Sequence, residues 1–195
     1  MLLLFCGCQE NAQTTSPPIF YSREYYERQR CNKANDEINA LRNSKNFKEA
    51  LRLCNFYISS FDPNLCKSLT SKKYMICVDE YQYFYNNKDY YNAIPAIRRA
   101  IEYCNDCDNY EYAGLYGNLA SCLQQTTRYE EAMVSIEKAI EYNPEYVELY
   151  FIAFNILTDM GDSNKAAEYI KRASNVNPQK AREIILSLTD PNKNY

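Results

Sequence analysis

The hydrophobic positions of residues 112–144 recur at intervals of three and four, as they do in two consecutive amphipathic helices. The first pattern is expected to bury Leu119, and the second is expected to bury Ile136. Only residues 126–128 separate the two patterns, so the helices are predicted to pack as an antiparallel hairpin. Pro144 ends the pattern, because proline lacks an amide hydrogen and disfavours helix in the residue before it.

The next stretch of the chain repeats this pattern in register. Ala166 follows Ala132 by 34 residues, and Pro178 follows Pro144 by the same distance. The two copies resemble the tetratricopeptide repeat, a 34-residue helical hairpin that stacks into a solenoid. The resemblance implies an all-α fold in which small residues such as Ala132 and Ala166 let neighbouring helices approach closely.

Weaker copies of the same hairpin precede these two. We predict an α-solenoid of about four hairpins within residues 21–195, at approximately residues 31–64, 74–107, 113–146 and 147–180. Residues 179–189 are expected to form a C-terminal capping helix that covers the last open face, and Ser22 is expected to cap the first helix. The equivalent alanines are separated by 43, 39 and 34 residues, so the earlier connections carry extra loop: Ala50, Ala93, Ala132 and Ala166.

Residues 1–8, MLLLFCGC, resemble the end of a bacterial lipoprotein signal, in which a small residue precedes the lipid-bearing cysteine. The resemblance implies that Cys8 carries acyl chains, which hold a domain on a membrane by about 0.8 kcal/mol per buried CH₂. Residues 9–20, which are polar as far as Pro18, are then a flexible linker, and the protein is anchored in the cell envelope. The segment lacks a positively charged start and has a short apolar core. A start codon assigned too far downstream and a cytoplasmic protein with an arbitrary apolar N-terminus therefore both stay open.

The composition matters mainly for what it excludes. The 195 residues are 46% hydrophobic and 24% charged with a net charge of −3, which suits one domain and lacks the basic surplus of a nucleic-acid-binding protein. The sequence contains no histidine, and this removes the usual general base and the commonest metal ligand. Neither a paired-carboxylate pattern nor a phosphate-binding loop is present, so we expect a non-enzymatic protein without cofactor or metal.

Nine cysteines are many for a reducing compartment and favour export. In the predicted array, five of them gather at one edge around the two longer loops: Cys31, Cys66, Cys77, Cys104 and Cys107. We expect at least one disulfide there, with the pairing left open, and a free thiol at Cys122 in a helix centre. The CxxC spacing of Cys104 and Cys107 also fits zinc, so a Cys-dependent metal-binding protein is the less favoured alternative.

The family resemblance also implies a binding site, because the first helices of tetratricopeptide repeats line a concave groove for an extended peptide or a partner helix. It places these side chains in the groove: Asn32, Asn35, Asn39, Arg42, Val78, Gln82, Tyr85, Asn86, Asn118, Ser121, Gln124, Gln125, Phe151, Asn155 and Thr158. Many are carboxamides, which offer a donor and an acceptor to a peptide main chain. A merely solvated face of an Asn-rich chain explains the same residues equally well.

One family subtype is not expected. Grooves that bind a C-terminal carboxylate use lysines and an arginine, which are absent from the matching positions: Asn35, Asn39, Asp79, Gly114 and Asn118. The sequence therefore predicts a lipid-anchored scaffold that binds another protein or an extended peptide, with a cytosolic adaptor of the same fold as the alternative. The sequence leaves the oligomeric state open.

Overall fold

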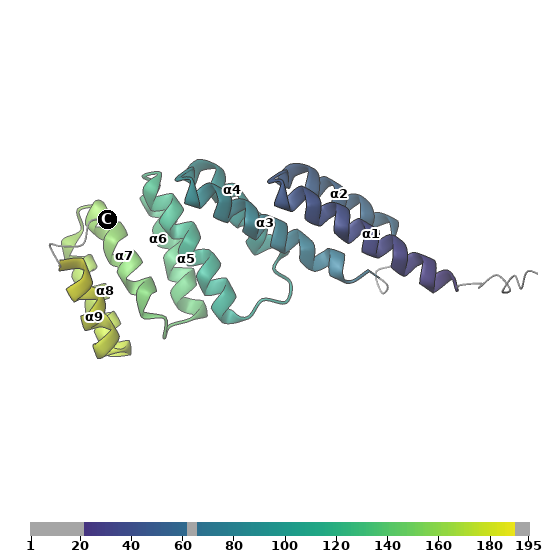
Figure 1. Cartoon of the computed structure of the whole chain (residues 1–195). Helices are drawn as coiled ribbons and strands as arrows, with labels where there is room; N and C mark the ends of the chain where they lie inside the picture. The colour runs from purple at the N-terminus through teal and green to yellow at the C-terminus, as the bar shows by residue number, and fades with distance from the viewer. Residues whose placement is uncertain (1–21, 62–65, 190–195) are drawn as a thin grey trace, which may run out of the picture.

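The structure, a computed structural model of the chain, describes residues 22–61 and 66–189 (Figure 1). These residues form helices and no β-strand, which confirms the predicted all-α fold. The predicted signal segment, the linker and Cys8 lie outside the described residues. The helices are α1 (Arg23–Asn43), α2 (Phe47–Ser60), α3 (Ser68–Asn86), α4 (Tyr90–Tyr103), α5 (Asn109–Gln125), α6 (Tyr129–Tyr142), α7 (Val147–Asp159), α8 (Ser163–Val176) and α9 (Pro178–Thr189).

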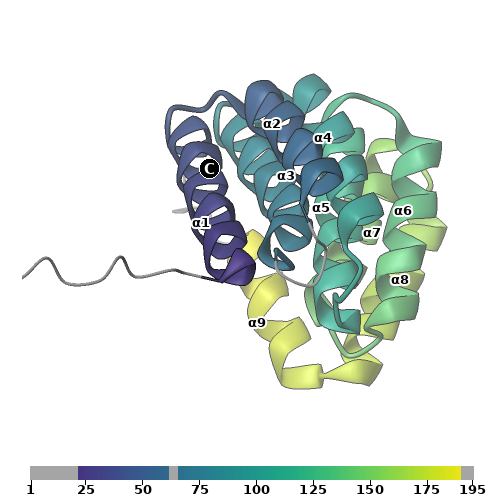
Figure 2. The same ribbon diagram turned by 90° about the vertical axis from the view of Figure 1, so that its right-hand side faces the viewer.

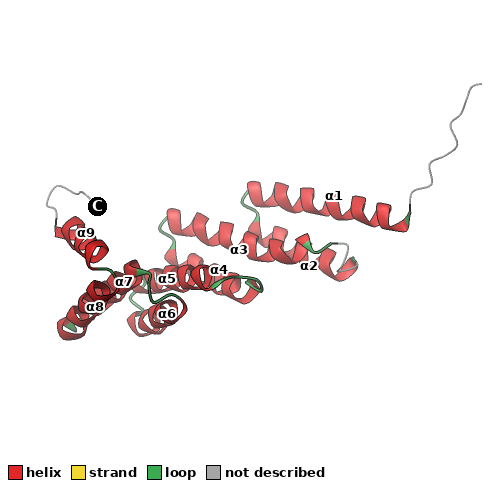
Figure 3. Ribbon diagram, turned by 90° about the horizontal axis from the view of Figure 1, so that it is seen from below, coloured by secondary structure: helices red, strands yellow, loops and turns green. Residues whose placement is uncertain are grey.

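Consecutive helices pair into four hairpins that stack in a row, each packing against the next. The first helices α1, α3, α5 and α7 lie along one side of the row and the second helices α2, α4, α6 and α8 along the other (Figures 2 and 3). Helix α9 packs on α8 with Ala181 buried, and Lys180 at its start pairs with Glu148 of α7 at 3.2 Å. The predicted solenoid with a capping helix is confirmed.

The turn inside each hairpin has the same geometry in all four copies. One residue of each turn has a positive φ, between 58° and 80°, and lies five residues before the buried alanine of the second helix. These residues are Lys45, Lys88, Thr127 and Gly161. The irregular spacing of the alanines therefore does not arise in these turns. The prediction that it comes from extra loop was mostly wrong, because the first helices α3, α5 and α7 contain 19, 17 and 13 residues and account for most of the difference.

The buried side chains form two clusters. The first joins α1, α2 and the start of α3 around Ile38, Cys54 and Ile76. The second runs without a break from Cys77 of α3 to Ala181 of α9. The side chain of Leu51 contacts both clusters. The N-terminal hairpin thus has its own small core, while the remaining hairpins share one.

Two details of local structure bear on the sequence predictions. Ser22 caps α1, since its Oγ accepts a hydrogen bond from the amide of Tyr25 at 3.2 Å, as expected. Helix α3 begins at Ser68, six residues before the start expected near Tyr74. Its added first turns are polar and carry little hydrophobic period, but Leu69 is buried and anchors them.

None of the helices in the described part of the chain has the length and apolar character needed to cross a membrane.

Candidate binding groove

At the N-terminal end of the row, polar side chains link α1 to α3. The ammonium of Lys72 donates to Asn39 Oδ1 at 2.8 Å, and the guanidinium of Arg42 contacts Asp79 Oδ2 at 2.6 Å. The side chains of Arg42 and Asp79 are only 14% and 34% exposed. Burial, followed by the nearby charge of Arg42, lowers the pKa of Lys72. Two predicted groove residues, Asn39 and Arg42, therefore serve as cross-links between repeats.

Similar links join the later first helices. Asn118 of α5 donates through Nδ2 to the hydroxyl of Tyr81 on α3 at 3.3 Å. Gln124 of α5 donates through Nε2 to Asp159 of α7 at 2.7 Å. These partners lie 37 and 35 residues apart, about one repeat, so these carboxamides bind the neighbouring repeat and not solvent.

A polar cleft of about 430 Å³ opens where α1 and α3 end. It brings together three predicted groove residues, Arg42, Gln82 and Asn86, with the carboxylate of Asp79. Gln82 and Asn86 are exposed, and within the described residues their side chains make no hydrogen bond. Their carboxamides are therefore open to a ligand. The whole lining is Arg42, Asn43, Lys45, Asp79, Gln82, Tyr83, Asn86 and Asn87.

Half of this lining was missed by sequence reasoning. Asn43, Lys45, Tyr83 and Asn87 lie at the helix ends and in the hairpin turn, whereas the family pattern predicts only positions on the helix face. The turn five positions before Ala50 was the available signal, because its residue Lys45 lines the cleft.

The other predicted groove residues lie away from this cleft. Asn32, Gln125, Asn155 and Thr158 are exposed, and Val78 and Ser121 are half-buried on α3 and α5. Tyr85 packs its ring edge-on against Tyr90 at 5.6 Å between centroids.

Two predicted groove residues are not available to a ligand. Phe151 is 5% exposed and belongs to the main core, so its assignment to the groove was wrong. Asn35 donates through Nδ2 to Ser68 at 3.0 Å, and its Oδ1 is buried without a partner. Asn35 is thus part of the junction between α1 and α3, because α3 extends further back than expected and covers it.

The sequence of the C-terminal half matches a known family. The family model described as "Tetratricopeptide repeat" matches residues 113–146 and 148–180. Residues 113–146 and 148–180 are therefore two tetratricopeptide repeats.

Solved structures share the tetratricopeptide fold. The TPR2B domain in a pHsp70 complex of yeast Sti1 is 24% identical, with a TM-score of 0.52 over 59% of this chain and 92% of that one. The crystal structure of MamA is 20% identical, with a TM-score of 0.50 over 84% and 99%. MamA from Desulfovibrio magneticus RS-1 is 16% identical, with a TM-score of 0.51 over 76% of both. No curated protein matches the sequence.

The cysteines of the described residues fall into pairs and buried thiols. Cys31 pairs with Cys66, and Cys104 pairs with Cys107, with Cα atoms 5.8 Å and 5.4 Å apart. Cys77 was wrongly included among the disulfide candidates. The early start of α3 puts it in mid-helix, where it is fully buried as a free thiol.

The remaining thiols are poor nucleophiles and ligands. Burial raises the pKa of Cys54 and Cys77 to about 11 and that of Cys122 to about 12, so all three stay protonated at neutral pH. The described residues hold no group of three potential metal ligands. The two cysteines of the CxxC spacing bond each other, which removes the observation that favoured zinc.

Proposed function

We propose that this protein is a non-enzymatic scaffold that binds an extended segment of another protein along its first helices. The observation that carries this proposal is the 430 Å³ cleft, where two unpaired carboxamides stand beside the Arg42–Asp79 ion pair. Such a cleft offers hydrogen-bond donors and acceptors, and it has little apolar surface that could select particular side chains. It suits a peptide main chain.

The spacing of the two carboxamides supports a peptide that runs parallel to α3. Gln82 and Asn86 are four residues apart on one helix face, which corresponds to a rise of about 6 Å. Alternate residues of an extended peptide are separated by about 6.7 Å. The two carboxamides can therefore bind main-chain groups of two alternate residues of such a peptide. Among structures with this fold, the yeast Sti1 domain is described in complex with pHsp70, a precedent for holding a partner.

A displayed library of random unstructured peptides, selected on the purified full chain, tests the groove. We expect enriched peptides to bind the double variant Gln82→Ala/Asn86→Ala about tenfold more weakly, because each lost hydrogen bond contributes about 0.5–1.5 kcal/mol. The matched control is Asn164→Ala/Asn175→Ala, which removes two exposed carboxamides from α8. The proposal fails if no peptide is enriched, or if both double variants bind equally well.

We further propose that Cys8 is acylated and that the scaffold is held on a membrane of the bacterial envelope. The support is the Phe-Cys-Gly-Cys sequence, which is followed by the linker composition of residues 9–20 before the first helix pattern. Mass spectrometry of the N-terminus separates this proposal from the cytosolic adaptor. A diacylated or triacylated Cys8 supports the anchor, and an intact Met1 contradicts it.

A further inference from the structure

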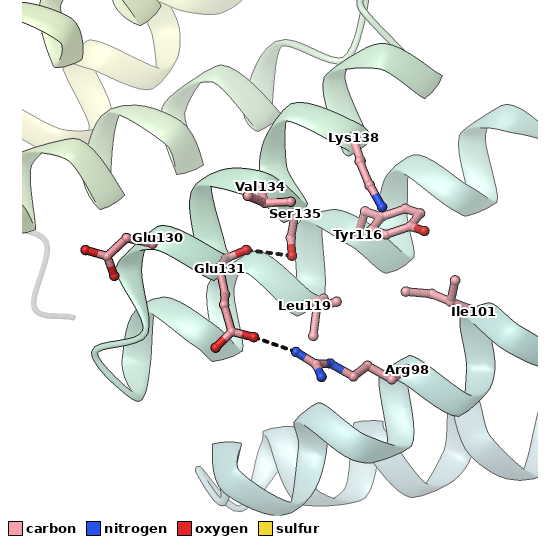
Figure 4. Close-up of a pocket in the computed structure, with 9 residues that line it drawn as sticks. All are labelled: Arg98, Ile101, Tyr116, Leu119, Glu130, Glu131, Val134, Ser135 and Lys138. Atoms are coloured by element: carbon pink, nitrogen blue, oxygen red, sulfur yellow. Dashed lines mark hydrogen bonds and ion pairs between the residues drawn. The ribbon is translucent and has the colours of Figure 1, made fainter.

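The side of the molecule formed by the second helices carries a different cleft. It lies between α4 and α6, has a volume of about 410 Å³ and has the apolar side chains of Ile101, Tyr116, Leu119 and Val134 in its lining (Figure 4). An ion pair between Arg98 of α4 and Glu131 of α6, 2.8 Å long, spans the cleft at one end (Figure 4). The groove proposed above uses none of these residues.

One position that lines the cleft differs between the last two repeats. Ser135 of α6 is small and donates its hydroxyl hydrogen to the carbonyl of Glu131 at 2.9 Å. The equivalent residue 34 positions later is Tyr169, which is only 7% exposed and has the guanidinium of Arg172 4.6 Å from its ring centroid. The tyrosine supplies bulk at the junction of α6 and α8 that serine does not supply at the junction of α4 and α6.

The rim of this cleft has an unusual charge pattern. Val134 is 61% exposed, and Glu130 and Lys138 lie one turn before and one turn after it on the same stripe of α6 (Figure 4). Both charged residues are exposed, and neither has an ion-pair partner among the described residues. Lys138 lies over the ring of Tyr116, 5.4 Å from its centroid.

The other second helices, each described in full, do not repeat this stripe. At the equivalent three positions α2 has Lys48, Arg52 and Phe56, α4 has Tyr91, Pro95 and Arg99, and α8 has Asn164, Glu168 and Arg172. Helix α6 alone among these four has an apolar residue centred between opposite charges.

We propose that α6 docks antiparallel against α6 of a second copy of this chain, forming a two-fold symmetric dimer. Four helical residues rise by about 6 Å, so both charges are equally far from Val134. An antiparallel copy centred on Val134 therefore sets Glu130 of each chain opposite Lys138 of the other. The stripe is self-complementary, as a two-fold interface requires. Val134 of each copy meets Val134 of the other at the two-fold axis, where both residues line the apolar clefts.

The expected dimer is weak. The apolar contact is confined to one cleft and one valine on each copy, which places the interface among the small, transient ones. We expect a dissociation constant on the order of 100 µM. The dimer leaves the groove on the other side of the row free, so this inference does not depend on the proposed peptide site.

Sedimentation velocity of the full chain, from about 1 µM to about 1 mM, tests the dimer. Glu130→Lys and Lys138→Glu each replace two attractive contacts with two repulsive ones, and each is expected to weaken dimerisation at least about tenfold. The double variant Glu130→Lys/Lys138→Glu restores the pairing with its charges exchanged and is expected to dimerise like the original chain. Glu168→Lys on α8 is the matched control and is expected to change nothing.

A variant that closes the cleft gives an independent test. Ser135→Tyr copies the arrangement at Tyr169, and it is expected to abolish dimerisation while helical circular dichroism is retained. The proposal is overturned if the original chain stays monomeric at 1 mM, in which case the cleft serves another occupant. It is also overturned if the double charge exchange fails to restore a dimer that the single variants lose, or if the single variants dimerise normally.

Discussion

The two ends of this solenoid are built by different means. At the C-terminal end, one continuous core runs from Cys77 of α3 to Ala181 of α9, and the residues that the family model matches, 113–146 and 148–180, lie within it. At the N-terminal end, α1, α2 and the start of α3 have a separate small core, a disulfide from Cys31 to Cys66 and the Arg42–Asp79 ion pair. Because a repeat is stabilised mainly by its neighbours, a hairpin that departs from the common register needs other links to hold it.

Core truncation should separate the two ends most clearly. Ile136→Ala and Ile38→Ala each remove a fully buried side chain and should each cost about 2–5 kcal/mol. Ile136→Ala is expected to lower the main unfolding transition in urea. Ile38→Ala is expected to raise hydrogen exchange in α1 and α2 and to leave the C-terminal helices protected. Equal loss of protection along the whole row would mean that the two cores unfold as one.

The disulfides should differ in the stability they provide. Cys31 and Cys66 are 35 residues apart, so in the chain-entropy account replacing both by serine costs about 4 kcal/mol, mostly at the N-terminal end. Cys104 and Cys107 are 3 residues apart, and the same replacement is expected to cost about 2 kcal/mol. Urea unfolding of the two double variants, with the original chain in reductant as reference, measures the difference. The opposite order would contradict the assigned role of the longer link.

The buried thiols report local opening along the row. In native protein at pH 8, a maleimide is expected to label Cys54 first, Cys77 next and Cys122 last, with about tenfold between the extremes, because Cys54 belongs to the small core. Mass spectrometry of the labelled peptides measures the order. Identical rates at Cys54 and Cys122 would show that the row opens as a single unit.

The same thiols give the pH dependence a definite sign. Their pKa values rise from 9.0 to about 11 or 12 on burial, so the folded state keeps them protonated while the unfolded state ionises. This contribution to stability is complete below pH 9 and is lost as the pH rises towards 11 and 12. Replacing Cys122 by alanine should flatten the decline in the urea midpoint over that range.

The smallest expected effects lie in the hairpin turns. Gly161 has φ of +80°, so Gly161→Ala should cost about 1 kcal/mol even though the added methyl group meets no atom within 4 Å. Lys45 holds the equivalent conformation at the other end, and Lys45→Gly should stabilise its hairpin by about 0.5 kcal/mol. Urea midpoints at unchanged slope measure both. A loss of stability in Lys45→Gly would show that its side chain contributes to the turn.

The sequence predicted what depends on periodicity. The buried faces, the anchoring alanines, the capping helix and Ser22 follow from spacing that the chain repeats. The sequence did not predict that Asn39 and Gln124 would hydrogen-bond to a neighbouring repeat instead of facing solvent. A helical period shows on which face of a helix a side chain lies, but it does not show its hydrogen-bond partner. The start of α3 was missed because Leu69 is the one buried residue in its first two turns, and a single residue shows no hydrophobic periodicity. The cleft beside α6 shows only when Ser135 is compared with Tyr169.

The constant five-residue interval from turn to alanine has a consequence for how this chain can be altered. New sequence inserted between a turn and its alanine would break an interval kept in all four copies, whereas residues 104–108 form a longer junction than residues 143–146. Junctions are therefore the places to graft a tag, a reporter or a further hairpin. The segment from each turn to its buried alanine is constant in length, whereas the first helices range from 21 residues in α1 to 13 in α7.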